Sequence, residues 1–112
     1  MMVSRGAAAE QTAADYLTQQ GLVLVERNFR CRLGEIDLIM RDGQTLVFIE
    51  VRQRASQQFG GAAGSIDGRK QQKLIATAQQ YLARLGKTPP CRFDALLLQG
   101  QSMEWIRDAF GA

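Results

Sequence analysis

Apolar residues recur every three or four positions in two parts of this chain and alternate with polar residues elsewhere. The three-to-four spacing runs through residues 4–20 and 69–85, and this spacing predicts two amphipathic helices. Gly21 and Gly86 follow these segments as C-terminal glycines, and Asp67 stands where the second helix would have its N-cap. We therefore expect one helix near the N-terminus and one in the second half of the chain.

The remaining segments have the composition and spacing of strands. Residues 22–29 are predominantly apolar, and residues 34–54 alternate on either side of Asp42-Gly43, a strong hairpin signal. Residues 91–99 form a mostly apolar, interior strand in this interpretation, and residues 102–107 form a short one. The order helix, three strands, helix, two strands predicts a parallel crossover through the second helix. The fold class is therefore α/β: a single domain over residues 1–112, with a mixed five-stranded sheet and a helix on each face.

The predicted hairpin places acidic residues on one face of the sheet. With Asp42-Gly43 at the centre of the turn, Asp37 faces Phe48 and Glu35 faces Glu50. Asp37 and Glu50 then become diagonal neighbours, with Cα atoms roughly 7–8 Å apart. One face carries Glu35, Asp37, Ile39, Leu46, Phe48, Glu50 and Arg52. The other face is wholly apolar and carries Ile36, Leu38, Met40, Val47, Ile49 and Val51.

This acidic group has two interpretations. Because both faces of the hairpin contain large apolar residues, both are expected to be covered, and carboxylates there lose hydration and repel each other unless a cation or proton intervenes. That favours a functional acidic cluster, while a structural cluster stays open. Glu10 is a third candidate, since Ala13, Ala14 and Leu17 lie three, four and seven residues after it on the buried stripe of the first helix. An exposed Glu10 is the alternative.

Composition excludes several kinds of site. The chain has no His, and its two Cys residues are far apart, so a zinc site and a Ser–His or Cys–His nucleophile are not expected. Catalysis would have to use carboxylates, Lys, Arg or a metal ion. No apolar run approaches the roughly 20 residues of a membrane span, and the N-terminus lacks a signal-peptide core. We expect a cytoplasmic protein that has no membrane partner.

Basic residues indicate a polyanionic partner. The net charge is +3, and eleven of the fourteen basic residues are Arg, whose planar head matches phosphate. Three cations at the start of the second helix oppose the helix dipole, which makes sense if an anion binds there. Solvated charges are the alternative in each case. The candidate nucleic-acid contacts are Arg30, Arg32, Arg54, Arg69, Lys70 and Lys73. The polar, Gly-rich residues 53–65 are a candidate mobile flap with Phe59 for base stacking, or else a plain connector.

Several motifs together resemble a known family. The segments GEIDLI, VFIEVRQR, FGGAAGSIDGRKQQKL, CRFD and the closing DAF resemble the YraN family, small bacterial proteins of undetermined biochemical role. The resemblance extends over nearly the whole chain, from Glu10 to Phe110. That family is similar in turn to the restriction-endonuclease-like nucleases, and particularly to archaeal Holliday-junction resolvases. The resemblance therefore implies a restriction-endonuclease-like fold.

The resemblance also implies roles for particular residues. Glu10, Asp37 and Glu50 match the acidic positions of the nuclease motif and would hold Mg²⁺ or Mn²⁺, with Arg52 as the fourth catalytic position. The motif has a Lys at that fourth position. Arg52 keeps the charge but does not readily release a proton, so cleavage would be slowed or abolished if the Lys activates water. Lys70 or Lys73 could reach the site instead.

Three functions remain open at this point. The first is a divalent-metal-dependent endonuclease acting on branched or otherwise structured DNA, with a homodimer expected by analogy with junction resolvases. The second is a nucleic-acid-binding protein of the same fold whose cleavage is weak or lost. The third is an interaction protein with no nucleic-acid role. The acidic cluster favours the first two, and Arg52 shifts the balance towards the second.

Overall fold

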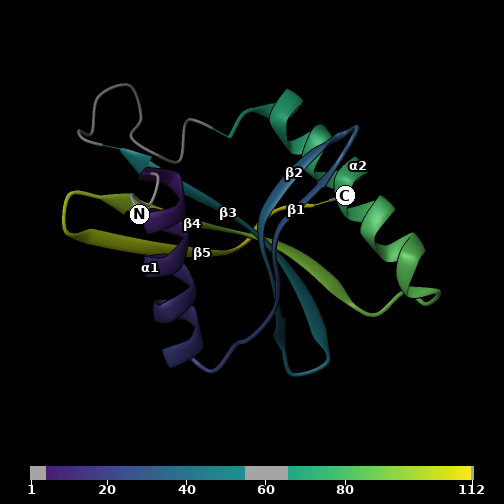
Figure 1. The fold of residues 1–112 in the computed structure, drawn as a ribbon, viewed down its shortest axis with the longest axis horizontal. Coiled ribbons are helices and arrows are strands. Elements are labelled where there is room, and N and C mark those ends of the chain that lie inside the picture. The colour runs from purple at the N-terminus through teal and green to yellow at the C-terminus, as the bar shows by residue number, and fades with distance from the viewer. Residues whose placement is uncertain (1–4, 55–65, 112) are drawn as a thin grey trace.

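A computed structural model describes residues 5–54 and 66–111 of the chain, and within these ranges all seven predicted elements are present. The helices are α1 (Arg5–Gln19) and α2 (Gly68–Leu85), and the strands are β1 (Val23–Cys31), β2 (Gly34–Asp42), β3 (Thr45–Arg54), β4 (Cys91–Gln99) and β5 (Ser102–Phe110) (Figure 1). Asp67 caps α2 by accepting a hydrogen bond from the Lys70 amide at 2.9 Å, and Gly86 ends it at φ 72°.

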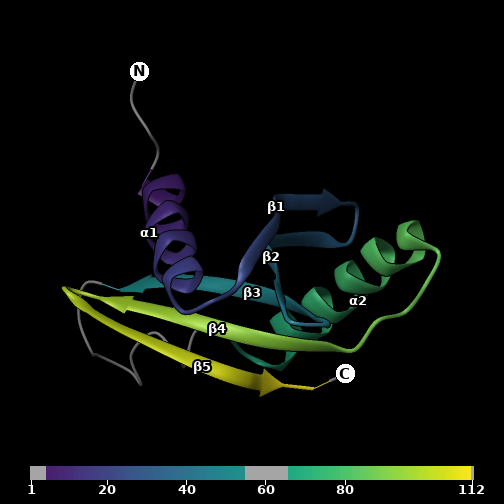
Figure 2. The ribbon, with the colours of Figure 1, turned by 90° about the horizontal axis from the view of Figure 1, so that it is seen from below.

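The five strands form one mixed sheet in the order β1-β2-β3-β4-β5. Strands β3 and β4 are parallel, and the other three pairs are antiparallel. Figure 2 shows β4 and β5 running beside β3, while the β1–β2 hairpin curls away from them. The predicted single α/β domain with a mixed five-stranded sheet is confirmed, and the strand order is consistent with the nuclease-like architecture.

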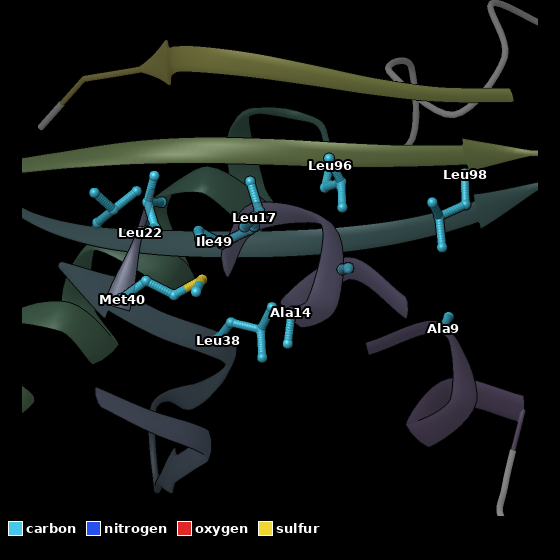
Figure 3. Packing of buried hydrophobic residues seen from close by; sticks show 11 residues of the cluster. Ala9, Ala14, Leu17, Leu22, Leu38, Met40, Ile49, Leu96 and Leu98 are labelled. Carbon is cyan, nitrogen blue, oxygen red and sulfur yellow. The ribbon is translucent and has the colours of Figure 1, made fainter. Parts of the chain in front are cut away.

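Each face of the sheet is covered by one helix, and each interface is apolar. On the α1 side, Leu17 packs among Leu38, Ile49 and Leu96, and all four are fully buried (Figure 3). On the α2 side, Leu74 and Tyr81 pack against Phe48 and its neighbours. Spacing in the sequence places Leu74, Ala78, Tyr81, Leu82 and Leu85 on the buried stripe of α2, and this prediction was wrong at Leu85, which is 38% exposed because the helix ends there beyond the edge of its buried cluster.

The predicted centre of the β2–β3 turn was wrong by one residue. Asp42 pairs with Thr45, so the two residues between the strands are Gly43 and Gln44. Gly43 has a φ of 62°, and glycine in the first central position avoids the cost that Asp42 would meet at positive φ. Every cross-strand partner therefore moves by two residues. Because side chains alternate with period two, the acidic residues stay on the face predicted for them.

The far end of β2 departs from regular alternation. Its pairing with β3 ends at Leu38, while its pairing with β1 continues to Gly34. Ile36 was predicted to share the face of Leu38 but lies in the α2-side cluster, because the hairpin twists away from β3 beyond that point. In β1, Asn28 has a φ of 52°, which breaks the extended conformation of that strand beside the twist.

Gly34 allows the hairpin to lie against α2. A Cβ atom at this position would be 2.9 Å from the Thr77 hydroxyl oxygen, closer than side chains tolerate. Thr77 is fully buried, and its hydroxyl donates to the Lys73 carbonyl oxygen at 2.8 Å, so it cannot easily move away. The first residue of the GEID motif therefore fixes how closely α2 approaches the strand that carries Asp37.

A buried ionic network fastens β5 to β4. Asp94 is fully buried and accepts hydrogen bonds from the Trp105 indole at 2.9 Å and the Asp108 amide at 2.9 Å. Its two oxygens also lie 3.0 and 3.2 Å from Arg92 Nε, and Arg92 Nη1 donates to Asp42 at 2.9 Å. The network therefore gives Asp94, the Asp of the CRFD motif, a structural role.

Candidate functional site

Asp37 is the centre of the candidate site. It lies one residue beyond the last β2–β3 pair, and continuing that register places it directly opposite Glu50. Its Oδ2 atom accepts a hydrogen bond from the Val51 amide at 2.8 Å. The carboxylate therefore takes the place of a backbone partner at the point where the two strands separate. This bond fixes its position beside β3.

Glu50 lies on the α2 side of the sheet and is only 5% exposed. Its Oε2 atom is 2.7 Å from Arg52 Nη2 and 3.5 Å from Lys70 Nζ. Burial, and then the hydrogen bond and charge of Asp37, raise the pKa of Glu50 above its ordinary value, while the charge of Arg52 opposes that rise. A buried carboxyl with two neighbouring cations and a neighbouring acid is a strained electrostatic arrangement.

Glu10 reaches the same group from α1. Burial, followed by the charge and hydrogen bond of Asp37, raises the pKa of Glu10 to about 7, and a hydrogen bond from Asn28 acts in the opposite direction. Three carboxyls from α1, β2 and β3 thus influence one another through Asp37. The prediction that Glu10 faces inward, and that Asp37 and Glu50 share a site, agrees with this arrangement.

Asn28 belongs to the site and was missed in the sequence. It is bracketed by the β1–β2 pairs on either side of it, which place it opposite Asp37. Asn is one of the few non-glycine residues that adopt a positive φ readily, and it interrupts the apolar and charged run of β1. This interruption by Asn28 was the feature of the sequence that could have identified it as a site residue.

Asp37 and Glu50 line a cavity of about 270 Å³ together with basic residues from β3 and α2, whereas Glu10 is not part of this lining. Its lining contains Glu35, Asp37, Glu50, Arg52, Lys70 and Lys73. The Arg52 Nε atom is buried and has no hydrogen-bond partner among the described residues. The cavity therefore combines carboxyl groups with cations, and Lys70 and Lys73 are the members of the predicted basic set that line it.

The other predicted basic contacts are not all at this cavity. Arg30 forms an exposed ion pair with Glu35 at 2.6 Å, which places it beside the cavity. Arg32 lines a different cavity, next to Gln80, and Arg69 is exposed on α2 outside the lining. The side chain of Arg54, residues 55–65 and Phe59 lie outside the described residues, so the flap and its stacking contact stay predictions.

The donor chemistry of the acidic residues suits a hard cation such as Mg²⁺ or Mn²⁺, which prefers carboxylate oxygens. Nevertheless, within residues 5–54 and 66–111 no three His, Cys, Asp or Glu side chains are arranged as a ready-made metal site. One cause is visible at Glu50, whose Oε2 atom is directed at Arg52 and Lys70. The residue types fit a metal, but their arrangement would have to change to bind it.

A larger cavity of about 740 Å³ lies elsewhere, between the C-terminal half of α2 and the segment leading to β4. It is lined mainly by apolar and aromatic residues such as Phe48, Leu82 and Phe93, and it contains no Asp or Glu. The smaller cavity is the better functional candidate despite its size, because it combines acidic and basic side chains and includes Glu50, a carboxyl whose pKa is raised.

Comparison with known proteins places the whole site within one family. The model of the "Uncharacterised protein family UPF0102" matches residues 9–98. A UPF0102 protein from Nitrosomonas eutropha is 56% identical over 108 residues, covering 96% of this chain and 93% of the relative. A UPF0102 protein from Methylobacillus flagellatus is 54% identical over 114 residues, covering 99% and 100%. The matched range includes Glu10, Asp37, Glu50, Arg52 and Lys70.

In the part of the chain that the structure describes, neither helix has the length and apolar character to cross a bilayer.

Proposed function

The chain belongs to the uncharacterised protein family UPF0102, and from that premise we propose that it is a divalent-metal-dependent endonuclease acting on structured or branched DNA. One observation carries the proposal. Carboxyl groups from three separate segments, α1, β2 and β3, interact around Asp37, and those of Asp37 and Glu50 line a cavity with Arg52 and Lys70. Like-charged groups are costly to bring together in a buried place, and a functional cation would offset that cost.

Glu10, Asp37 and Glu50 would hold Mg²⁺ or Mn²⁺. When bound, such an ion polarises a phosphoryl oxygen and lowers the pKa of a water molecule. The hydrogen bond from the Val51 amide keeps the Asp37 carboxylate next to β3. Glu50 is positioned by the strand that carries it, and the cavity of about 270 Å³ that it lines would receive a phosphodiester.

The chain's cations would bind and orient that phosphodiester. Arg52, Lys70 and Lys73 line the same cavity as the acids, and Arg30 lies at its edge. The Arg52 Nε atom, which has no partner among the described residues, would donate to a phosphate oxygen. These groups supply positive charge where negative charge develops during phosphoryl transfer.

A second candidate function is nucleic-acid binding with cleavage weak or lost. It is favoured by Arg52, whose guanidinium lies 2.7 Å from Glu50. A guanidinium, unlike a lysine amine, does not readily release a proton. A residue of this kind can stabilise charge but does not activate water as a base. Binding would then persist without hydrolysis.

One experiment separates the two candidates. The protein is incubated with Mg²⁺ or Mn²⁺ and a panel of duplex, single-stranded, flap and four-way-junction DNAs, alongside Asp37→Asn. The matched control is Asp15→Asn, since Asp15 is an exposed residue of α1 whose carboxylate accepts a hydrogen bond from Gln11 in its own helix.

Metal-dependent cleavage that disappears in Asp37→Asn and persists in Asp15→Asn supports the endonuclease. Salt-sensitive DNA binding without cleavage in any variant supports the binding protein. Absence of both activities with every DNA would overturn the two candidates and leave the interaction protein.

A further inference from the structure

Glu50 offers one oxygen atom to two cations from different elements. Arg52 comes from the same face of β3, two residues further along, and Lys70 comes from the first turn of α2. Both contact Oε2 rather than sharing the two oxygens of the carboxylate. We call Arg52 and Lys70 the Glu50 cation pair.

The Glu50 cation pair stabilises the negative charge of the Glu50 carboxylate, as a metal ion would. The Glu50 side chain is 6% exposed, and a carboxylate so deeply buried is stabilised by a cation or it takes up a proton. A divalent ion that binds through Oε2 needs the lone pairs of the same oxygen, and an ion at either oxygen is repelled by the two cations already beside the carboxylate. Metal binding through Oε2 therefore requires at least one of the two cations to leave.

Lys70 is the member of the pair that can leave. Its ammonium is 3.5 Å from Oε2, compared with 2.7 Å for the guanidinium of Arg52. Its side chain is 39% exposed against 24% for Arg52, so it regains hydration on release more readily. A lysine stem is also flexible, whereas the Arg52 side chain is buried at its Nε atom as well.

We propose that Lys70 occupies the metal position at Glu50 in the metal-free protein, is displaced when a divalent ion binds, and then becomes a contact for the phosphate of the substrate. The inference rests on the proposed function, since it concerns the same acidic site. It explains why the three carboxyls are not arranged as a ready-made metal site although their chemistry suits a metal. Substrate phosphate then favours metal binding by giving the displaced ammonium a new partner.

The test is the affinity for Mn²⁺, measured at constant pH by the electron paramagnetic resonance signal of the free ion. Lys70→Met removes the competing cation and is expected to bind Mn²⁺ roughly five- to tenfold more tightly than the wild type. Lys73→Met is the matched control. Lys73 has the same charge as Lys70, lies on the same helix and lines the same cavity. Among the described residues, however, Glu50 forms its ion pairs with Arg52 and Lys70 and not with Lys73.

The control distinguishes the displacement of Lys70 from a general decrease in the positive charge of the cavity. Lys73→Met is expected to change Mn²⁺ affinity less than about twofold, because it removes charge without freeing the oxygen. Lys70→Arg, which retains a cation at the position, is expected to bind Mn²⁺ less tightly than Lys70→Met.

The inference and the proposed function fail in different ways. Mn²⁺ binding by the wild type with equal changes in Lys70→Met and Lys73→Met, or with no change in either, overturns the displacement and leaves the metal site standing. Weaker Mn²⁺ binding in Lys70→Met also overturns it. Absence of Mn²⁺ binding in all variants overturns the inference together with the metal-dependent function.

Discussion

Replacing Asp94 with Asn should strongly destabilise the protein. Asp94 is fully buried, and its two oxygens receive the Arg92 guanidinium, the Trp105 indole and the Asp108 amide. Asn keeps the shape but presents one NH₂ group, which must face either the Trp105 N–H or the Asp108 N–H. The variant therefore leaves a buried donor without an acceptor and removes the charge opposite Arg92.

The magnitude follows from these two losses. An unsatisfied buried donor costs roughly 1–3 kcal/mol, and breaking a buried ion pair from one side costs about 3–5 kcal/mol in total. We expect the free energy of unfolding to fall by about 3–4 kcal/mol, which lowers the midpoint temperature by roughly 10–25 °C for a domain of this size.

Urea and thermal unfolding, followed by circular dichroism, measure the change. The matched control is Asp108→Asn. Asp108 contributes only its backbone amide to the network, its side chain is exposed, and Asn tolerates its φ of 53°. A free energy of unfolding for Asp94→Asn within about 0.5 kcal/mol of the wild type, or equal to that of Asp108→Asn, would refute the reasoning.

Three further predictions concern the site and its support. Gly34→Ala should destabilise the fold by about 1–3 kcal/mol through the clash with the Thr77 hydroxyl, and Thr77→Ala in the same chain should recover part of that loss in urea unfolding. Glu50→Gln should stabilise the protein in EDTA by on the order of 1–3 kcal/mol at pH 8. Because the folded state raises the pKa of Glu50 above 4.5, wild-type stability falls as pH rises beyond that value, and the variant's advantage should shrink towards zero below pH 4.5. Arg52→Lys should increase metal-dependent cleavage at least severalfold in a junction-cutting assay, and unchanged or lower cleavage would show that Arg52 does not limit the chemistry.

The pattern of the sequence was sufficient to predict the elements and the acidic face. Alternation with period two placed Asp37 and Glu50 on one face of the hairpin, and a helical stripe placed Glu10 towards the sheet. The error in the turn at Gly43 did not damage the site, because a change of two residues in the pairing preserves which face each side chain occupies.

The features that the sequence left open or missed depend on how the elements pack together. Which of Lys70 and Lys73 contacts Glu50 was left open, and it depends on how closely α2 approaches the sheet, which the contact between Gly34 and Thr77 sets. The place of Asn28 depends on a twist that begins where β2 leaves β3. Neither distance nor twist is encoded in the local spacing of apolar residues.

The central claim is that carboxyls from α1, β2 and β3 bind one divalent ion, and paramagnetic broadening of backbone amides by Mn²⁺ tests it most directly. At substoichiometric Mn²⁺, amides of three separate segments, around Glu10, Asp37 and Val51, should broaden together in the NMR spectrum, and Asp37→Asn should abolish the effect. Broadening confined to exposed acids such as Asp15 or Glu104, or broadening that survives in Asp37→Asn, would contradict the account.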